Sequence, residues 1–405
     1  MSKLTESDKT ELSYIPTKLL QAKRADLFSA ITTAIATSFA EIKKYEYSVN
    51  EHNWVVYDSS KFKITRDITD SSYNCFFSKE TGLNVRFGKE VKDDPAYCEL
   101  GPEIADIEIV AGKCPKINGK NCAFCYKNNG GEIANCMTFK QFKELIDFMP
   151  KNLSQIAFGI TGVKTNPEFF DMMQYAKDVG VVSNYTTNGV DLDDECIEKT
   201  LDLCGRIAVS CYEGAKEICY DTMDRVGKAA AKRNVKFPCN IHLVLSKATF
   251  GHVKDVLNDA KEKKIPNLGA IVILRIKPVG RASNLDCVIP KEYYKEIVDF
   301  CLTNNVKFGF DSCGAKAVED VLVESGHADL TDCIESCESS RLSSYFNWKR
   351  EYWSCSFCEN NHKIMDAIDP FKFKDFPSFW NSDEVKRLRF PAKMACKSCP
   401  WYCLD

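Results

Sequence analysis

The segment Ile104–Tyr126, IADIEIVAGKCPKINGKNCAFCY, combines a short apolar run with three closely spaced cysteines. The run ends at Gly112 and predicts a β-strand. Cys114, Cys122 and Cys125 follow in the loop directly after this strand. Three thiolates from one loop can hold three corners of a cubane iron–sulfur cluster and leave its fourth iron without a protein ligand. The segment therefore predicts a reactive metal site at the end of a strand.

The same alternation of strand and helix signals continues along the chain. From about residue 104 to about residue 305, a short apolar run followed by an amphipathic helical pattern occurs six times, roughly every 30 residues. The apolar runs are 104–112, 153–162, 181–189, 206–214, 240–246 and 270–280. A helix is expected to begin at Thr138, because Gln141 completes a capping box. Right-handed connections between parallel strands would curl these units into an open or closed α/β barrel, with functional loops at the strands' carboxyl ends.

The segments on either side of these units have different sequence patterns. Residues 1–100 predict an α+β lead-in, with a helix around Pro16–Glu41 and then β-rich segments. No compact helix–sheet recognition module is evident there. Residues 313–405 lose the βα rhythm and are rich in cysteine and aromatic residues, so a metal cluster would serve as their organising centre. We therefore expect three domains, at 1–100, 101–312 and 313–405.

The composition narrows the function classes. The chain has 405 residues, 21 cysteines, 44% hydrophobic residues and a formal net charge of −3. Its start lacks a basic stretch followed by an apolar run, and no run approaches the roughly 18 apolar residues that span a bilayer. We therefore expect a cytoplasmic protein without membrane contact, in which cysteines bind metal rather than form disulfides. The near-neutral charge argues against a protein that mainly binds nucleic acid.

The cysteine loop and the strands that follow it resemble the radical S-adenosylmethionine (radical SAM) superfamily. In that family, a loop after the first strand of a partial (βα)6 barrel carries three cysteines, usually spaced C-x3-C-x2-C with an aromatic residue before the last. Phe124-Cys125 keeps this ending, whereas the gap between Cys114 and Cys122 is seven residues instead of three. The resemblance implies a partial (βα)6, TIM-like barrel and a [4Fe–4S] cluster on Cys114, Cys122 and Cys125.

Later strand ends match the family in the right order. Thr186-Thr187-Asn188-Gly189 resembles its T-N-G segment, Val209-Ser210 a position whose hydroxyl approaches SAM, and the run KPVGR at 277–281 a similar run after the sixth strand. The second strand departs from the pattern, because Gly159-Ile160-Thr161-Gly162 replaces G-G-E-P. The resemblance implies SAM contacts from Phe124, Tyr126, Gly159, Thr161, Gly162, Thr187, Asn188, Ser210 and Lys277. The two aromatic residues could equally well shield the cluster.

A second cysteine group occupies the C-terminal region. Cys337-x17-Cys355 followed by Cys396-x2-Cys399 resembles the twitch module, a shortened relative of the SPASM extension that carries an auxiliary [4Fe–4S] cluster. The resemblance implies Cys337, Cys355, Cys396 and Cys399 as ligands, with Cys358 and Cys403 as second choices and Cys313 and Cys333 as third choices. A zinc site from Cys355-x2-Cys358 and Cys396-x2-Cys399 has an equally regular spacing and stays open.

The resemblance also implies a reaction. A reduced cluster at the first cysteine group would bind SAM at its open iron and cleave it to methionine and a 5′-deoxyadenosyl radical, which abstracts a substrate hydrogen. The electron would come from a reductant such as flavodoxin or ferredoxin. A peptide or protein substrate is favoured slightly over a small molecule, on which the enzyme would act as a dehydrogenase or other oxidoreductase. A non-catalytic iron–sulfur or zinc protein is the alternative, and no catalytic residue is predicted.

Overall fold

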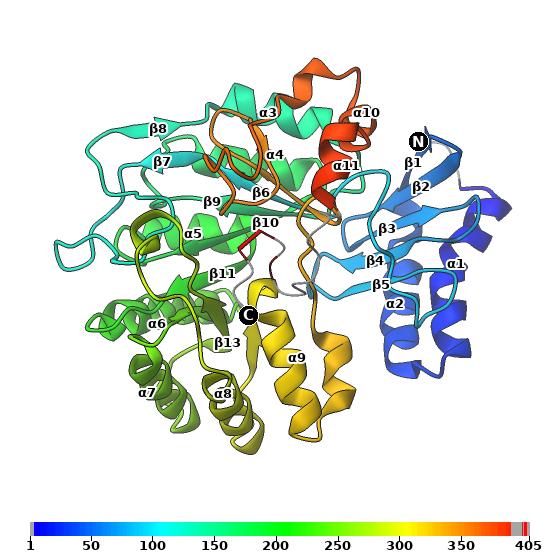
Figure 1. Ribbon diagram of the computed structural model, residues 1–405. Helices are drawn as coiled ribbons and strands as arrows, with labels where there is room; N and C mark the ends of the chain where they lie inside the picture. Colours follow the sequence, from blue (N-terminus) through cyan, green and yellow to red (C-terminus); the bar gives the residue numbers. More distant parts are fainter. Residues whose placement is uncertain (1–3, 390–398, 400, 403–405) are drawn as a thin grey trace.

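A computed structural model describes residues 4–389, 399, 401 and 402 (Figure 1). Its N-terminal part packs two helices against a five-stranded antiparallel sheet in the order β1-β2-β3-β4-β5. The elements are α1 (Glu6–Gln21), α2 (Ala25–Ser38), η1 (Phe39–Glu41), β1 (Lys43–Val49), β2 (His52–Asp58), β3 (Phe62–Asp67), β4 (Asn74–Ser78) and β5 (Asn84–Phe87). Leu12 and Ile15 of α1 share a buried core with Tyr57 and Phe76 of the sheet. Residues 1–100 therefore do contain a compact helix–sheet module, contrary to the sequence-based expectation.

The single helix expected around Pro16–Glu41 is also wrong. Helix α1 begins earlier, because Thr5 and Asp8 form a capping box that satisfies its first amide groups. Pro16 lies inside this helix rather than at its start. The turn between α1 and α2 contains Lys23, whose φ of 62° is incompatible with a continuing right-handed helix.

The rest of the chain is built on a nine-stranded sheet in the order β14-β13-β12-β11-β10-β9-β6-β15-β16. Its strands are β6 (Ile104–Glu108), β9 (Gln155–Gly159), β10 (Val182–Thr187), β11 (Cys204–Ser210), β12 (Cys239–Leu245), β13 (Leu268–Arg275), β14 (Phe308–Phe310), β15 (Ser343–Phe346) and β16 (Tyr352–Trp353). All pairs are parallel except β15 with β16. The predicted parallel α/β architecture is thus confirmed, whereas the described residues form no closed barrel, and the partial (βα)6 barrel stays a prediction.

A helix follows each of the strands from β9 to β13, and α3 precedes β9, as the repeating pattern predicts. The helices are α3 (Phe139–Phe148), α4 (Phe169–Asp178), α5 (Asp194–Leu203), α6 (Lys216–Lys232), α7 (Phe250–Lys261), α8 (Lys291–Thr303), α9 (Ala315–Glu324), α10 (Phe376–Trp380) and α11 (Asp383–Arg389). The 3-10 turns are η2 (Gly280–Ala282), η3 (Ser312–Gly314), η4 (Ala328–Cys333) and η5 (Pro370–Lys372). Helix α3 starts after Thr138, whose capping box with Gln141 is present as predicted.

The two faces of the main sheet differ in chemistry. On β12, Ile241, Leu243 and Leu245 are buried in one core with apolar side chains of the helices. The alternate residues on that strand point to the opposite face, which we call the inner face. Polar side chains of the inner face are half-buried; they are Asp106, Gln155, Asn184, Thr186, Arg206, Ser210, Asn240 and His242. Solvent-accessible polar groups on the inside of a sheet are candidates for binding a polar molecule.

The N-terminal module is joined to the main sheet by a buried lysine. Lys63 of β3 donates hydrogen bonds from Nζ to the carbonyl oxygens of Lys151 (2.8 Å) and Leu153 (2.7 Å), directly before β9. Asp58 is the nearest carboxylate, at 4.0 Å. Burial lowers the pKa of Lys63 to about 8, because the ammonium form loses its hydration.

This lysine predicts a pH-dependent stability. Above pH 8 folded Lys63 is neutral, whereas in the unfolded chain it stays charged up to about pH 10.4. Because the unfolded state binds the extra proton, Lys63 should contribute a rise of up to about 3 kcal/mol to the free energy of unfolding between these pH values, against the opposite contribution of buried thiols such as Cys98, whose pKa burial raises to about 12. In urea titrations at several pH values, the free energy of unfolding of Lys63→Met should fall relative to wild type as the pH rises, whereas the exposed control Lys43→Met should keep the wild-type profile. Parallel pH profiles of all three proteins would contradict the prediction.

Candidate metal centres

A small hairpin presents the first cysteine group. Strands β7 (Val110–Gly112) and β8 (Ala134–Cys136) pair antiparallel, so that residues 113–133 leave and rejoin the sheet beside the end of β6 (Figure 1). The Gly112 amide donates to Asn129 Oδ1 at 2.8 Å, and Gly112 O accepts from Gly130 N at 2.6 Å. Gly112 has a φ of 92°, and a Cβ there would overlap the carbonyl of Ile133. The loop is therefore closed at its base.

The three thiols of this loop influence one another. Burial, together with the neighbouring Cys122 and Cys125, raises the pKa of Cys114 to about 11. Burial also raises the pKa of Cys122, against a hydrogen bond from Tyr212 that lowers it. The Cys114 thiol lies 3.5 Å from the carbonyl oxygen of Thr161. A thiolate on one of these cysteines disfavours ionisation of Cys114, and a soft metal ion bound in place of the protons would offset that repulsion. The donor set thus fits a thiolate-bound metal.

Arg281, in the turn η2 after β13, forms several hydrogen bonds with the cysteine loop. Its backbone amide donates to Cys125 O at 3.0 Å, and its guanidinium donates to Cys122 O at 3.2 Å and to Asn128 O at 3.3 Å. Gly280, with a φ of 61°, allows this approach, because a Cβ there would overlap the carbonyls of Cys125 and Tyr126. Arg281 was not predicted as a site residue, although the KPVGR run that contains it was singled out.

The predicted SAM contacts on the second strand lie beside Cys114. Gly159 ends β9, and Gly162 sits where a Cβ would come within 2.6 Å of Pro115 Cγ. Thr161 is buried, and its hydroxyl has no hydrogen-bond partner among the described residues. A buried hydroxyl without a partner is costly, so a bound polar group would stabilise it. This segment therefore fits a ligand beside the cysteine loop.

The next predicted SAM contacts lie at the ends of β10 and β11, and one of them binds the cysteine loop. Asn188 donates from Nδ2 to Pro115 O at 3.0 Å, whereas the hydroxyl of Thr187 accepts from the Gly189 amide. Ser210 ends β11, and its side chain is hydrogen-bonded to Tyr212. Asn188 is thus a contact of the loop itself, whereas Thr187 and Ser210 are the last residues of β10 and β11.

The two aromatic residues of the loop point to different neighbours. Phe124 stacks on Tyr212, with ring centroids 5.9 Å apart and an interplanar angle of 23°. Tyr126 contacts Phe357, with ring centroids 4.6 Å apart. Phe124 thus covers the first cysteine group, whereas Tyr126 reaches the segment that carries Cys355 and Cys358. Tyr212 was not predicted from the sequence.

Five cysteines from distant parts of the chain gather in the second group. Cys355 Sγ and Cys358 Sγ are 3.4 Å apart. The thiols of Cys313 and Cys399 are hydrogen-bonded to each other, which raises the pKa of Cys313 and lowers that of Cys399. Burial raises the pKa of Cys337 to about 12, with contributions from Cys355 and Cys313. The described residues thus supply more than the four thiolates that a cubane or a zinc ion needs, and both metals stay open.

The remaining C-terminal cysteines are placed differently. Cys333 is exposed at the end of η4. Cys396, one of the four predicted ligands, and Cys403, a second choice, lie outside the described residues. The ranking of ligands therefore stays a prediction, and Cys313, ranked third, is among the cysteines that come together.

Two largely buried lysines form ion pairs close to the cysteine groups. Lys127 Nζ lies 3.0 Å from Glu108 and 2.5 Å from the Tyr345 hydroxyl, and it is also ion-paired with Glu359. Lys277 is ion-paired with Asp311, and its Nζ lies 4.4 Å from the centroid of the Phe357 ring.

Lys277 also interacts with the second cysteine group. Its side chain is hydrogen-bonded to Cys313, and the charges of Asp311 and Cys313 raise its pKa against the opposing effect of burial. Lys277, predicted to contact SAM, therefore lies against the second cysteine group.

Further titratable groups lie on the inner face of the main sheet. Burial raises the pKa of Asp106 to about 6 and lowers the pKa of His242 to about 4. His242 Nδ1 is 3.3 Å from the hydroxyl of Thr186. The sequence did not single these residues out, although polar residues at alternate strand positions were a usable signal.

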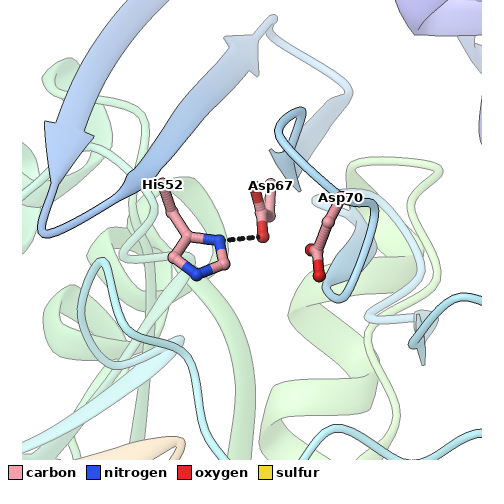
Figure 2. A group of neighbouring side chains, drawn as sticks. All are labelled: His52, Asp67 and Asp70. Carbon is pink, nitrogen blue, oxygen red and sulfur yellow. Dashed lines mark hydrogen bonds and ion pairs between the residues drawn. The ribbon is translucent and has the colours of Figure 1, made fainter.

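A histidine and two aspartates cluster in the N-terminal module (Figure 2). His52 Nδ1 is 2.7 Å from Asp67 Oδ2, which raises the pKa of His52. Asp67 also accepts from the Ser72 hydroxyl at 2.8 Å, and Asp70 is ion-paired with Lys89 at 2.9 Å. These carboxylates are satisfied by the chain itself, so the cluster braces the turn between β3 and β4. Within residues 4–389, no helix is both long enough and apolar enough to cross a bilayer.

No protein-family model and no curated protein sequence matches the chain. Several solved structures do match it. Streptococcus suis SuiB bound to the precursor peptide SuiA has a TM-score of 0.60 at 9% identity, covering 86% of this chain and 93% of that one. SuiB bound to S-adenosylmethionine has a TM-score of 0.54 at 11% identity, covering 75% and 69%. Native anSMEcpe with bound AdoMet has a TM-score of 0.50 at 17% identity, covering 75% and 88%. The chain thus has the fold of these radical SAM enzymes, which the resemblance of its motifs implied.

Proposed function

We propose that this protein is a radical SAM enzyme whose [4Fe–4S] cluster is held by Cys114, Cys122 and Cys125. One observation carries the proposal: three interacting thiols lie on a single closed loop at the end of β6, in a fold whose solved examples bind S-adenosylmethionine. Three ligands leave one iron open for a small molecule. When bound there, the cluster supplies the electron that cleaves SAM to methionine and a 5′-deoxyadenosyl radical.

The chain's own residues would bind and orient SAM around this loop. The hydroxyl of buried Thr161, which has no partner among the described residues, belongs to the residue whose carbonyl lies beside Cys114, and it can bind the polar end of the molecule. Asn188 and Arg281 hold the loop backbone in place. Phe124, stacked on Tyr212, covers the loop and limits the access of water. These groups position the reaction without taking part in electron transfer.

The substrate we propose is a peptide or protein. SuiB bound to its precursor peptide matches 86% of this chain. The inner face offers half-buried polar side chains, including Thr186 and His242, which could hydrogen-bond a peptide backbone. A small-molecule substrate would use the same face. The second cysteine group would hold an auxiliary [4Fe–4S] cluster, and a flavodoxin or ferredoxin would supply the electron.

The proposal is tested by reconstituting the protein with iron and sulfide under anaerobic conditions. With dithionite and SAM, we expect 5′-deoxyadenosine to form, measured by liquid chromatography with mass spectrometry. The fully loaded protein should contain about eight irons if both cysteine groups hold cubane clusters. Absence of 5′-deoxyadenosine from protein with a full complement of iron would contradict the proposed function. Stoichiometric zinc with about four irons would assign zinc to the second cysteine group.

A further inference from the structure

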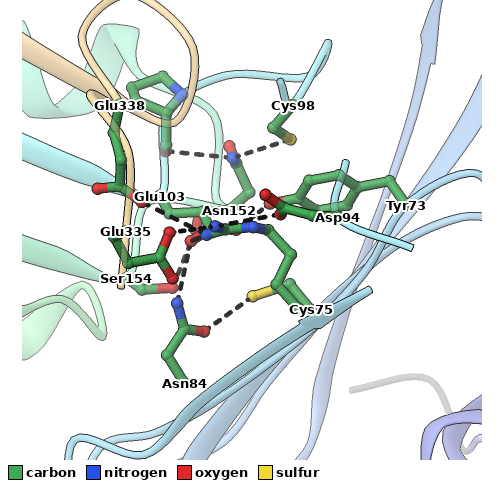
Figure 3. A network of polar contacts seen from close by, with 12 residues as sticks. Tyr73, Cys75, Asn84, Asp94, Cys98, Glu103, Asn152, Ser154, Glu335 and Glu338 are labelled. Atoms are coloured by element: carbon green, nitrogen blue, oxygen red, sulfur yellow. Dashed lines mark hydrogen bonds and ion pairs between the residues drawn. The ribbon is translucent and has the colours of Figure 1, made fainter. Parts of the chain in front are cut away.

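Arg86 is a buried cation at the junction of the N-terminal module, the main sheet and the C-terminal region. It lies on β5, and 6% of its side chain is exposed. Its guanidinium is 3.1 Å from Glu103, 3.1 Å from Glu335, 3.6 Å from Glu338 and 3.7 Å from Asp94. Figure 3 shows these carboxylates around one point, Asp94 and Glu103 from the segment between β5 and β6 and Glu335 and Glu338 from the turn before β15. Glu103 and Glu338 are the more buried of the four, and Arg86 compensates their charge most strongly.

Two of these carboxylates flank Cys337 in the sequence. Glu335 comes two residues before it and Glu338 directly after it. The carbonyl of Glu338 accepts backbone hydrogen bonds from Arg341, Leu342 and Ser343 at 2.9 to 3.1 Å, which closes a turn just before β15. Arg86 is therefore ion-paired on both sides of the cysteine, with Glu335 before it and with Glu338 after it in a hydrogen-bonded turn.

The N-terminal module also holds this turn through its backbone. Arg341 Nε donates to Ala96 O, and Arg341 Nη1 donates to Cys337 O at 3.2 Å. The Cys98 amide in turn donates to Arg341 O at 3.2 Å. Cys337 is thus fixed by contacts with residues 86–98, more than 200 positions away in the sequence.

The place of Cys337 matters because its thiol joins the second cysteine group. Its neighbours there include Cys355 and Cys313, which come from other segments. Cys355 and Cys358 share one short loop, and Cys399 contacts Cys313. Cys337 is the member whose backbone is held by the N-terminal module. A metal site requires its ligands within a few tenths of an ångström of the correct position, and outer contacts supply that precision.

We propose that Arg86 is a positioning residue for the C-terminal metal site, and that the N-terminal module serves as an assembly element for that site by fixing Cys337. The inference rests on the proposed function in that the second cysteine group binds a metal, whether as an iron–sulfur cluster or as zinc. It does not require SAM cleavage or a particular substrate.

The experiment compares metal retention in Arg86→Gln and wild type. Both proteins are reconstituted anaerobically and challenged with a chelator, and the iron, sulfide and zinc that remain per chain are measured over time. In wild type, we expect the C-terminal site to keep its metal. In Arg86→Gln, we expect this site to lose metal at least tenfold faster, while the metal at Cys114, Cys122 and Cys125 is released at the wild-type rate. The spectroscopic signal of the SAM-bound first cluster identifies which site has lost metal.

Three further variants separate positioning from general instability. Arg24→Gln removes an exposed arginine of the same module and should match wild type. Arg86→Lys keeps the charge and should retain metal better than Arg86→Gln. Glu335→Gln combined with Glu338→Gln leaves the ion pair of Arg86 with Glu103 intact and should still release metal faster.

Two results would overturn the inference. One is wild-type metal retention in both Arg86→Gln and the double glutamine variant. The other is a wild-type protein that binds no metal at the second cysteine group. A failure of the proposed function would give a different result. The protein would then form no 5′-deoxyadenosine, although its metal retention would still depend on Arg86.

Discussion

The variant Cys122→Ala/Cys125→Ala should form 5′-deoxyadenosine from SAM only at the background rate. A single remaining thiolate, Cys114, cannot hold a cubane cluster, and no described residue of the loop offers a comparable soft ligand. About four irons should be lost with the two cysteines, while the metal of the second group remains. Chromatography of the reaction with dithionite, together with iron and sulfide analysis, measures both effects.

Cys136→Ala is the matched control for this variant. Cys136 ends β8 at the base of the same hairpin, and its thiol contacts the carbonyl of Thr165 rather than the other cysteines. Its replacement should leave both iron content and SAM cleavage near wild type. Unchanged cleavage in the double alanine variant would refute the assignment of this loop as the reactive site, whatever metal the protein contains.

The parallel architecture was predictable because its signals are local. Each buried strand is an apolar run, and each helix that follows has its own amphipathic pattern, such as the capped helix after Thr138. The N-terminal module was missed for a related reason. The expected helix begins at Pro16, whereas α1 begins at Glu6, ten residues earlier, after the capping box of Thr5 and Asp8. The residues Thr5 and Asp8 are a local sequence signal for this helix start, and the proline is a weaker one.

The candidate site was predictable only in its cysteines. Arg281, Tyr212 and Lys127 were missed because their roles depend on contacts across the fold: Arg281 binds the carbonyl of Cys122, 159 positions away. The ligands of the second group could not be chosen from spacing for the same reason. Cys313 lies 86 positions before Cys399 in the sequence, and only the folded chain brings their thiols together.

Lys127→Met should be among the most destabilising single substitutions in the chain. The side chains of Lys127, Glu108 and Glu359 are only 12%, 5% and 10% exposed. Removing the cation leaves two buried carboxylates without compensation, and such a loss costs about 3–5 kcal/mol. One oxygen of Glu108 already has no partner among the described residues, so the chain offers no ready substitute. Urea unfolding of anaerobically prepared protein, followed by circular dichroism, measures the change in the free energy of unfolding.

Two controls decide whether the lost charge causes this effect. Lys349→Met removes an exposed lysine from the turn after β15 and should change stability by no more than about 0.5 kcal/mol. The triple variant Lys127→Met/Glu108→Gln/Glu359→Gln removes all three charges and should recover much of the loss, because an apolar or neutral replacement of a whole buried ion cluster is often tolerated. A Lys127→Met protein as stable as wild type would show that these carboxylates are solvated and that the network does not join the two cysteine groups. A large loss that the triple variant repairs would show that electrostatic compensation at Lys127 holds the loop of Cys125 against the loop of Cys358.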